Sequence, residues 1–159
     1  MIESYIWNCE EAPVDIRTMI PEDYDAVYSL WMHTPGMGIN NMDDSREGIT
    51  RYLARNPNTC FVAAVSGEIV GAILSGHDGR RGFIYHMAVA VPHREKGIGS
   101  LLLDHVLKAL KSEGITKVAL VVMDRNAIGN DFWERKGFVM RTDLIYRNKA
   151  LAELDRIDT

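Results

Sequence analysis

Residues 94–100 have the types and spacing of an anion-binding turn. An apolar segment over 83–91 ends at a proline, and Arg-Glu-Lys-Gly-Ile-Gly-Ser then runs straight into a helical pattern. The first turn of a helix has backbone N–H groups without intrahelical partners, and the peptide dipoles add partial positive charge there. Gly97 and Gly99 let a large anion lie against that backbone, and the neighbouring arginine and lysine add formal charge. We therefore expect a diphosphate to bind at this turn.

The spacing of the two glycines narrows the choice of diphosphate. A nucleoside triphosphate loop ends in Gly-Lys-Ser/Thr, whereas Ile98 and Ser100 follow the glycines here. A dinucleotide fingerprint needs a third glycine at position 102, which is Leu. What remains, Arg-x-x-Gly-x-Gly after a strand carrying Met-Ala-Val, resembles the acetyl-CoA signature of the GNAT N-acetyltransferase superfamily. The resemblance implies acetyl-CoA as the acetyl donor, with contacts from Met87, Ala88, Val89, Arg94, Glu95, Lys96, Gly97, Ile98, Gly99 and Ser100.

A second motif lies further along the chain. Residues 126–138 contain an Asn, then an aromatic pair, then Gly-Phe, which resembles the second signature of the family. With both motifs in order, the resemblance covers roughly residues 14–146, and it assigns Asn126, Phe132 and Trp133 to the cofactor site. The His-Asp-Gly-Arg-Arg-Gly turn at 77–82 also resembles that of small bacterial members of the YpeA type.

Trp133 departs from the family pattern at a position that matters for chemistry. The second residue of the aromatic pair is usually a Tyr in the family, whose hydroxyl protonates the departing CoA thiolate, and Trp offers no comparable acid. A general acid contributes about 10² to 10⁴ in rate, although a thiol leaves tolerably well as a thiolate. Tyr146, Tyr85 or water are the alternative proton donors. Trp133 itself is expected to pack against the cofactor or the core.

The strand at 83–91 carries no carboxylate to act as general base for an attacking amine. The family resemblance implies that backbone N–H groups near Met87 and Val89 stabilise the oxyanion. His86 is the better candidate base, because an imidazole is largely neutral at pH 7. Its neighbour Tyr85 should point to the opposite face of a regular strand. The alternatives are a structural histidine under a helix, or a mechanism that uses only water.

The composition indicates one globular domain over residues 1–159, with 47% hydrophobic and 25% charged residues. A net charge of −4 argues against nucleic acid or an anionic membrane as a partner and is compatible with an amine substrate. No apolar run reaches the roughly 18 to 20 residues of a membrane span. The two cysteines form no disulfide framework, and the five histidines show no metal-binding spacing. We therefore expect a cytoplasmic protein without a metal.

Strands are expected at 14–19, 59–65, 69–75, 83–91 and 117–123, and helices at 21–32, 45–55, 98–113 and 127–136. The last strand is almost wholly apolar, so burial on both of its faces is expected. Together with the family resemblance, this order indicates an α/β (α+β) fold with a mixed, mainly antiparallel sheet of roughly six to seven strands and about four helices. Residues 1–13 would add an arm or a strand, and a homodimer, common in the family, is left open.

The sequence thus predicts an enzyme that transfers the acetyl group of acetyl-CoA to a primary amine of a small molecule by direct attack. A protein amino terminus or lysine is the alternative acceptor. A CoA-responsive binding module without turnover is the alternative of a different class, because Trp133 and the missing carboxylate both weaken the argument for catalysis.

Overall fold

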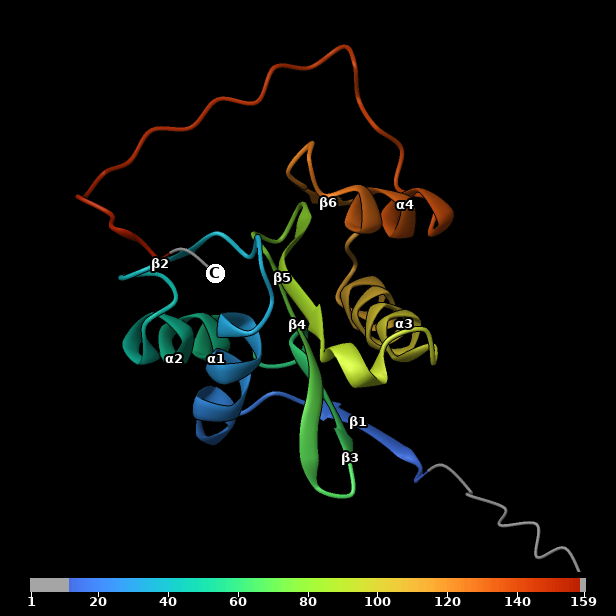
Figure 1. Cartoon of the computed structure of the whole chain (residues 1–159). Coiled ribbons are helices and arrows are strands. Elements are labelled where there is room, and N and C mark those ends of the chain that lie inside the picture. The colour runs from blue at the N-terminus through green and yellow to red at the C-terminus, as the bar shows by residue number, and fades with distance from the viewer. Residues whose placement is uncertain (1–11, 158–159) are drawn as a thin grey trace, which may run out of the picture.

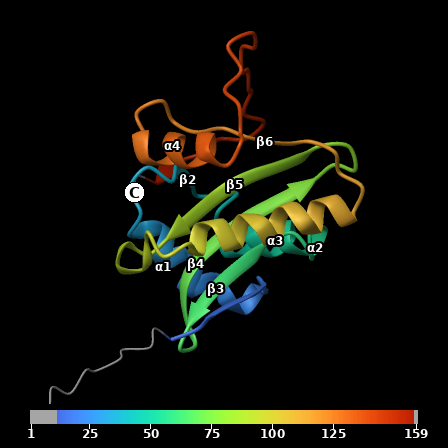
Figure 2. The ribbon, with the colours of Figure 1, turned by 90° about the vertical axis from the view of Figure 1, so that its right-hand side faces the viewer.

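The computed structural model describes residues 12–157, in which a central sheet carries helices on both faces (Figure 1, Figure 2). The strand order is β1-β3-β4-β5-β6, and all neighbours are antiparallel except β5 and β6. Strands β2 and β7 form a separate antiparallel pair. The elements in chain order are β1 (Val14–Thr18), η1 (Pro21–Asp23), α1 (Tyr24–Met32), β2 (Ile39–Asn40), α2 (Arg46–Arg55), β3 (Phe61–Val65), β4 (Glu68–His77), β5 (Gly82–Val89), η2 (Val91–His93), α3 (Ile98–Ser112), β6 (Val118–Leu120), α4 (Ala127–Arg135) and β7 (Arg156–Ile157).

The expected fold class is confirmed. Within residues 12–157 there are four α-helices and seven strands. The mainly antiparallel central sheet has five strands, fewer than the expected six to seven, because β2 and β7 pair with each other outside it. The arm or strand expected at residues 1–13 falls almost entirely on residues 1–11, which lie outside the described residues. None of the helices in the described part of the chain is long and apolar enough to cross a membrane.

Two apolar clusters hold the layers together. Helices α1 and α2 cover one face of the sheet, where Val27 and Trp31 are fully buried, while α3 covers the other face. The buried residues of α3 include Ile98, Leu102 and Val106, which recur at the four-residue step that keeps side chains on one side of a helix. Because α3 packs along β4 and β5, its first turn is fixed beside the end of β5.

Strand β6 differs from the expectation that residues 117–123 form a strand buried on both faces. Only Val118–Leu120 pair with β5, and Ala119 and Val121 are exposed. The physical reason is position, because β6 is the edge of the sheet and a strand is buried on both faces only where layers cover both. From α4 the chain runs as a wide arc to β7, which pairs with β2 (Figure 1).

An ion pair between the exposed Arg17 and the buried Asp23 anchors the start of the first helix. The Asp23 carboxylate accepts hydrogen bonds from both terminal nitrogens of Arg17, at 2.7 and 2.8 Å, and from Ile20 N–H at 2.9 Å. Burial by itself would raise the pKa of Asp23, but these hydrogen bonds and the charge of Arg17 outweigh it, so the pKa is lowered. A lowered folded-state pKa means that the carboxylate stabilises the folded protein at neutral pH and loses this effect in acid.

Asp23→Asn is therefore expected to lower the free energy of unfolding by about 1.5 to 3 kcal/mol at pH 7, the usual worth of hydrogen bonds to a charged group. Thermal unfolding should show a midpoint roughly 2 to 4 °C lower for each kcal/mol lost. The gap between the two proteins should close as the pH falls below about 4. A gap that stays constant with pH would contradict the role of the ionised carboxylate.

Candidate active site

The candidate active-site cavity lies where β5 and β6 part. The pairing between β5 and β6 ends at Ile84 and Leu120, although the chain continues beyond both of these residues. A cavity of about 710 Å³ opens here, and its walls come from the segment before α2, from β5, from the chain after β6 and from α4. The lining includes Gly38, Tyr85, His86, Met87, Asn126, Trp133 and Tyr146. The structure therefore brings together all three of the expected catalytic side chains.

The backbone of β5 directs donors toward the edge where this cavity opens. Ala90 N–H bonds the Val70 carbonyl at 2.8 Å, so these two residues form a hydrogen-bonded antiparallel pair. In an antiparallel ladder, hydrogen-bonded pairs of residues alternate with non-hydrogen-bonded pairs. The N–H groups of the non-hydrogen-bonded pairs point away from the partner strand. Met87 and Val89 occupy the intervening positions, so their N–H groups point away from β4 and toward the edge from which β6 has parted. This orientation suits the stabilisation of an oxyanion.

His86 is held by a carboxylate from a distant part of the chain. Its Nε2 lies 2.7 Å from Oδ1 of Asp44, a buried residue whose other oxygen accepts Asn40 N–H at 2.8 Å. The imidazole also packs edge-on against Trp31, with ring centroids 5.1 Å apart. Because a carboxylate only accepts, we assign the Nε2 proton to the bond with Asp44, which leaves the lone pair of Nδ1 available as a base.

A β-bulge puts Tyr85 and His86 on the same face of the sheet. Tyr85 and His86 together lie opposite the single residue Leu74 of β4, because the register shifts by one between flanking pairs. Tyr85 contacts Tyr52 of α2, and His86 contacts Trp31 of α1, and these helices cover one face. The expectation that the two side chains point to opposite faces is therefore wrong, since strand alternation fails at a bulge.

Two tyrosines reach the cavity as candidate proton donors. Tyr85 and Tyr146 both line it, and both are more than half exposed, at 58% and 67%. Partial burial raises the pKa of Tyr85, and the nearby Tyr146 and Asp43 raise it further. A raised pKa keeps the Tyr85 hydroxyl protonated at neutral pH, as a general acid requires.

The expected anion turn has the geometry of a helix amino terminus open to a ligand. Gly97 is the N-cap of α3, with φ of +81°, and its lack of a side chain leaves the first N–H groups of the helix uncapped. Arg94 Nε donates to the Val89 carbonyl at 2.9 Å, which holds the turn against the end of β5. Of the expected cofactor residues, Ile98 and Ala88 have buried side chains facing the core, so only their backbone can contact a ligand.

Gly97→Ala is expected to destabilise the folded protein by about 1 to 2 kcal/mol, because a left-handed torsion is strained for a residue with a Cβ. A Cβ at Gly97 would have no atom within 4 Å, so backbone strain is the sole cost. Gly97→Asn should cost less, since Asn adopts this torsion more readily. Chemical denaturation of both variants checks the prediction, and equal losses for Ala and Asn would contradict strain as the cause.

The side chain of Trp133 packs against two other aromatic rings. Its ring lies 5.0 Å from Phe132 and 5.1 Å from Phe138, edge to face in both cases, while it also lines the cavity. Asn126 begins α4 by accepting Gly129 N–H at 2.9 Å. Of the three residues assigned to the cofactor site from the second motif, Asn126 and Trp133 therefore combine a structural contact with a place in the cavity wall, whereas Phe132 packs against Trp133.

The described residues 12–157 contain no group of three or more His, Cys, Asp or Glu side chains placed to hold a metal ion. The expectation of a site without metal stays a prediction. Asp44 is the residue that sequence reasoning missed, since Asp-Asp-Ser before a helix is typical of a capping segment. Only the fold shows that this carboxylate meets a histidine 42 residues further along.

The parted strands, the uncapped helix start and the basic turn define a CoA-dependent acyltransferase. Residues 24–138 match the Acetyltransferase (GNAT) family, and the chain belongs to this family. It is 34% identical over 140 residues to Acetyltransferase ECA0875 of Pectobacterium atrosepticum, covering 88% of this chain and 97% of that protein. Acetyltransferase SG1711 of Sodalis glossinidius is 30% identical, with the same coverage of 88% and 97%. The protein is thus an acetyl-CoA-dependent acyltransferase, whereas a YpeA-type subgroup stays a prediction.

Solved structures show the same fold. Ard1 from Thermoplasma volcanium superposes with a TM-score of 0.71 at 25% identity, covering 80% of this chain and 84% of that one. The PaiA N-acetyltransferase from Thermoplasma acidophilum, in complex with coenzyme A, gives a TM-score of 0.67 at 20% identity, covering 78% and 88%.

Proposed function

We propose that this protein is an N-acetyltransferase that moves the acetyl group of acetyl-CoA to a primary amine of a small molecule by direct attack. The observation that carries the proposal is the placement of His86. Its ring, fixed by Asp44, lines the same cavity as Met87, whose N–H points to the open edge of β5. A base and an oxyanion donor thus face one space.

Different residues of the chain carry out the separate steps of the reaction. The free N–H groups at the start of α3, with Arg94 and Lys96 beside them, suit the diphosphate of the donor. His86 Nδ1 takes a proton from the amine as its nitrogen bonds to the thioester carbon. The Met87 N–H stabilises the negative charge on the thioester oxygen, and the carbon–sulfur bond breaks as that charge returns. Tyr85 or Tyr146 supplies the proton that the departing sulfur receives.

A cavity of about 710 Å³ has the size of small-molecule sites, which favours a small amine over a protein segment as the acceptor. We also propose a single acetyltransferase domain for the chain. Cytoplasmic location, the absence of a nucleic-acid partner and a homodimer stay predictions.

A thermal melt with acetyl-CoA, set beside CoA, NAD and ATP, tests the donor. A ligand at 100 times its dissociation constant stabilises by about 2.7 kcal/mol, so a rise of several degrees is expected for the CoA compounds alone. An amine panel with thiol detection then tests transfer, with a lysine peptide as the protein-acceptor arm. Binding of CoA without thiol release from any amine would instead favour a binding module.

A further inference from the structure

A second cavity lies at the other end of β5 from the anion turn. It measures about 600 Å³ and is lined by the end of α2, the end of β4 and the start of β6. It shares Phe83 and Tyr85 with the active-site cavity, so the two spaces adjoin along β5. An acceptor that presents its amine to His86 can therefore extend into this second cavity.

Three cations line this cavity in a protein whose net charge is −4. Arg55 comes from the last turn of α2, Arg81 from the β4–β5 turn, and Lys117 from the residue before β6. They converge because Gly82 pairs with the start of β6 while the end of α2 packs against the end of β4. A cluster of positive charge is unexpected in a protein with a net negative charge. Such a cluster is suited to binding a negatively charged group.

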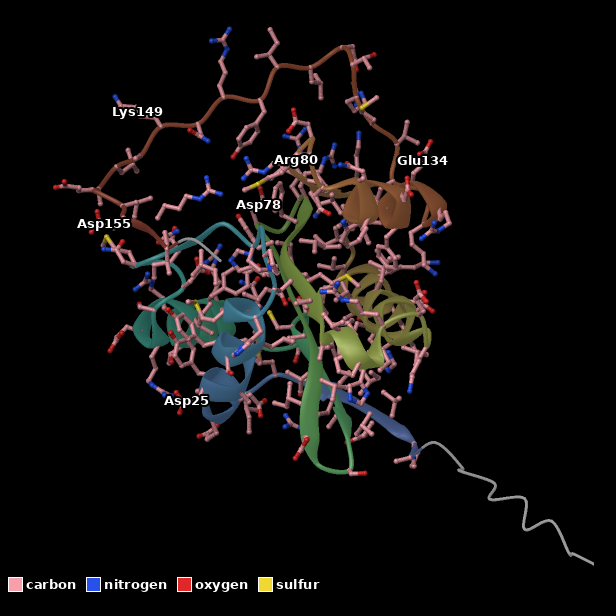
Figure 3. All side chains as sticks on the ribbon, viewed as in Figure 1. Asp25, Asp78, Arg80, Glu134, Lys149 and Asp155 are labelled. Carbon is pink, nitrogen blue, oxygen red and sulfur yellow. The ribbon has the colours of Figure 1, made fainter. Side chains whose placement is uncertain are left out.

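Asp78 and His77, which also line this cavity, already have hydrogen-bond partners. Asp78 Oδ1 accepts the backbone N–H groups of Arg80 and Arg81 at 2.8 and 2.7 Å. Figure 3 shows Asp78 and Arg80 at this β4–β5 turn. His77 Nε2 lies 2.6 Å from Oε2 of Glu113. The carboxylate of Asp78 therefore closes its own turn, while Lys117 lies near enough to Asp143 to help lower the pKa of that exposed carboxyl.

A buried donor without a partner also belongs to this cavity. The Tyr52 hydroxyl is buried and has no hydrogen-bond partner among residues 12–157. It lies close to Gly76, where an added Cβ would come within 2.6 Å of its oxygen. Burial raises the pKa of Tyr52, so the hydroxyl remains a donor. A buried unpaired hydroxyl is costly, and this one lies beside Gly76 in the wall of the cavity.

We propose that the acceptor amine carries a carboxylate or phosphate, and that Arg55, Arg81 and Lys117 bind this anionic group. The inference rests on the proposed function for the position of the amine at His86. Phe83 and His86 are three residue steps apart along β5, which is at most about 10 Å at roughly 3.3 Å per residue. The amine and the anionic group of the acceptor should therefore lie about 10 Å apart. The anion turn at one end of β5 would then bind the donor, and the three cations at the other end would bind the acceptor.

The test compares 8-aminooctanoate, whose ends are about that far apart, with octylamine, which lacks the carboxylate. Calorimetric binding to the protein saturated with CoA is expected to be about tenfold or more tighter for the aminocarboxylate, as charged hydrogen bonds predict. An 8-aminooctyl phosphate arm distinguishes phosphate from carboxylate. Equal affinity for 8-aminooctanoate and octylamine, or no measurable binding of either anionic probe, would overturn the proposal.

Variants on one turn supply the matched control. Arg81→Gln should remove most of the preference for the anionic probes, whereas Arg80→Gln makes the same charge change on a residue that lines neither cavity and should keep it. An equal loss in both variants would show that general charge, not a site, causes the preference. Thiol release with acetyl-CoA is a separate readout. Turnover of octylamine with no preference for the anionic probes would contradict this inference alone. Tighter binding of the anionic probes with no turnover of any amine would contradict the proposed function alone.

Discussion

His86→Gln is expected to lower kcat by about 10² to 10⁴, the usual contribution of a positioned general base. The reason is geometric, because His86 lines the cavity and its Nε2–H bond to Asp44 leaves Nδ1 as the nitrogen that can accept a proton. A glutamine keeps polarity and approximate size but accepts no proton at neutral pH. The measurement is thiol release at saturating acetyl-CoA and amine, with the donor-induced rise in melting temperature as a check that donor binding is intact.

Two further variants separate catalysis from structure. His105→Gln is the matched control, since His105 is an exposed histidine of α3 that bonds the Leu101 carbonyl and lines neither cavity. Its rate should be unchanged. Asp44→Asn should lower the rate less than loss of the imidazole does, because the amide oxygen can still accept the Nε2 proton and hold the ring. A full rate in His86→Gln would contradict the base and favour proton transfer to water.

The anion turn and the elements around it were predictable because their signals are local. Left-handed glycines mark turns and helix ends at Gly67, Gly97 and Gly114, where φ lies between +81° and +83°. Ser45 caps α2 by accepting Gly48 N–H at 3.0 Å, as a serine before an apolar pattern indicates. Each of these features depends on a few neighbouring residues, so a single sequence contains the information.

The pairing of Asp44 with His86 could not be predicted from the sequence, because it depends on residues that are far apart in the chain. Asp44 and His86 meet only because α1 and α2 cover the face of β5 on which the bulge places His86. A bulge is a property of two paired strands, and the residue types at positions 85 and 86 do not indicate it. The same holds for β6, whose apolar sequence indicates burial, whereas its position at the sheet edge leaves Val121 exposed.

Gly99→Leu is expected to abolish measurable binding of acetyl-CoA. A Cβ at Gly99 would already lie 2.8 Å from Cε of Met87 and 3.5 Å from the Phe132 ring. The flexible Met87 end can yield to a methyl group, but a branched side chain projects into the space beside the uncapped N–H groups of α3. The diphosphate then loses its backbone donors while the cationic side chains remain, so loss of binding would locate the affinity in the backbone.

The melt with ligand measures this directly, because wild-type protein at 100 times its dissociation constant should gain about 2.7 kcal/mol and Gly99→Leu should gain none. Lys108→Leu adds the same side chain at an exposed position of the same helix and should keep the full rise. A Gly99→Leu protein that unfolds normally without ligand and still shows the full rise would mean that the donor binds elsewhere. The uncapped start of α3 would then be a structural feature alone, and the thioester would approach His86 from a different donor position.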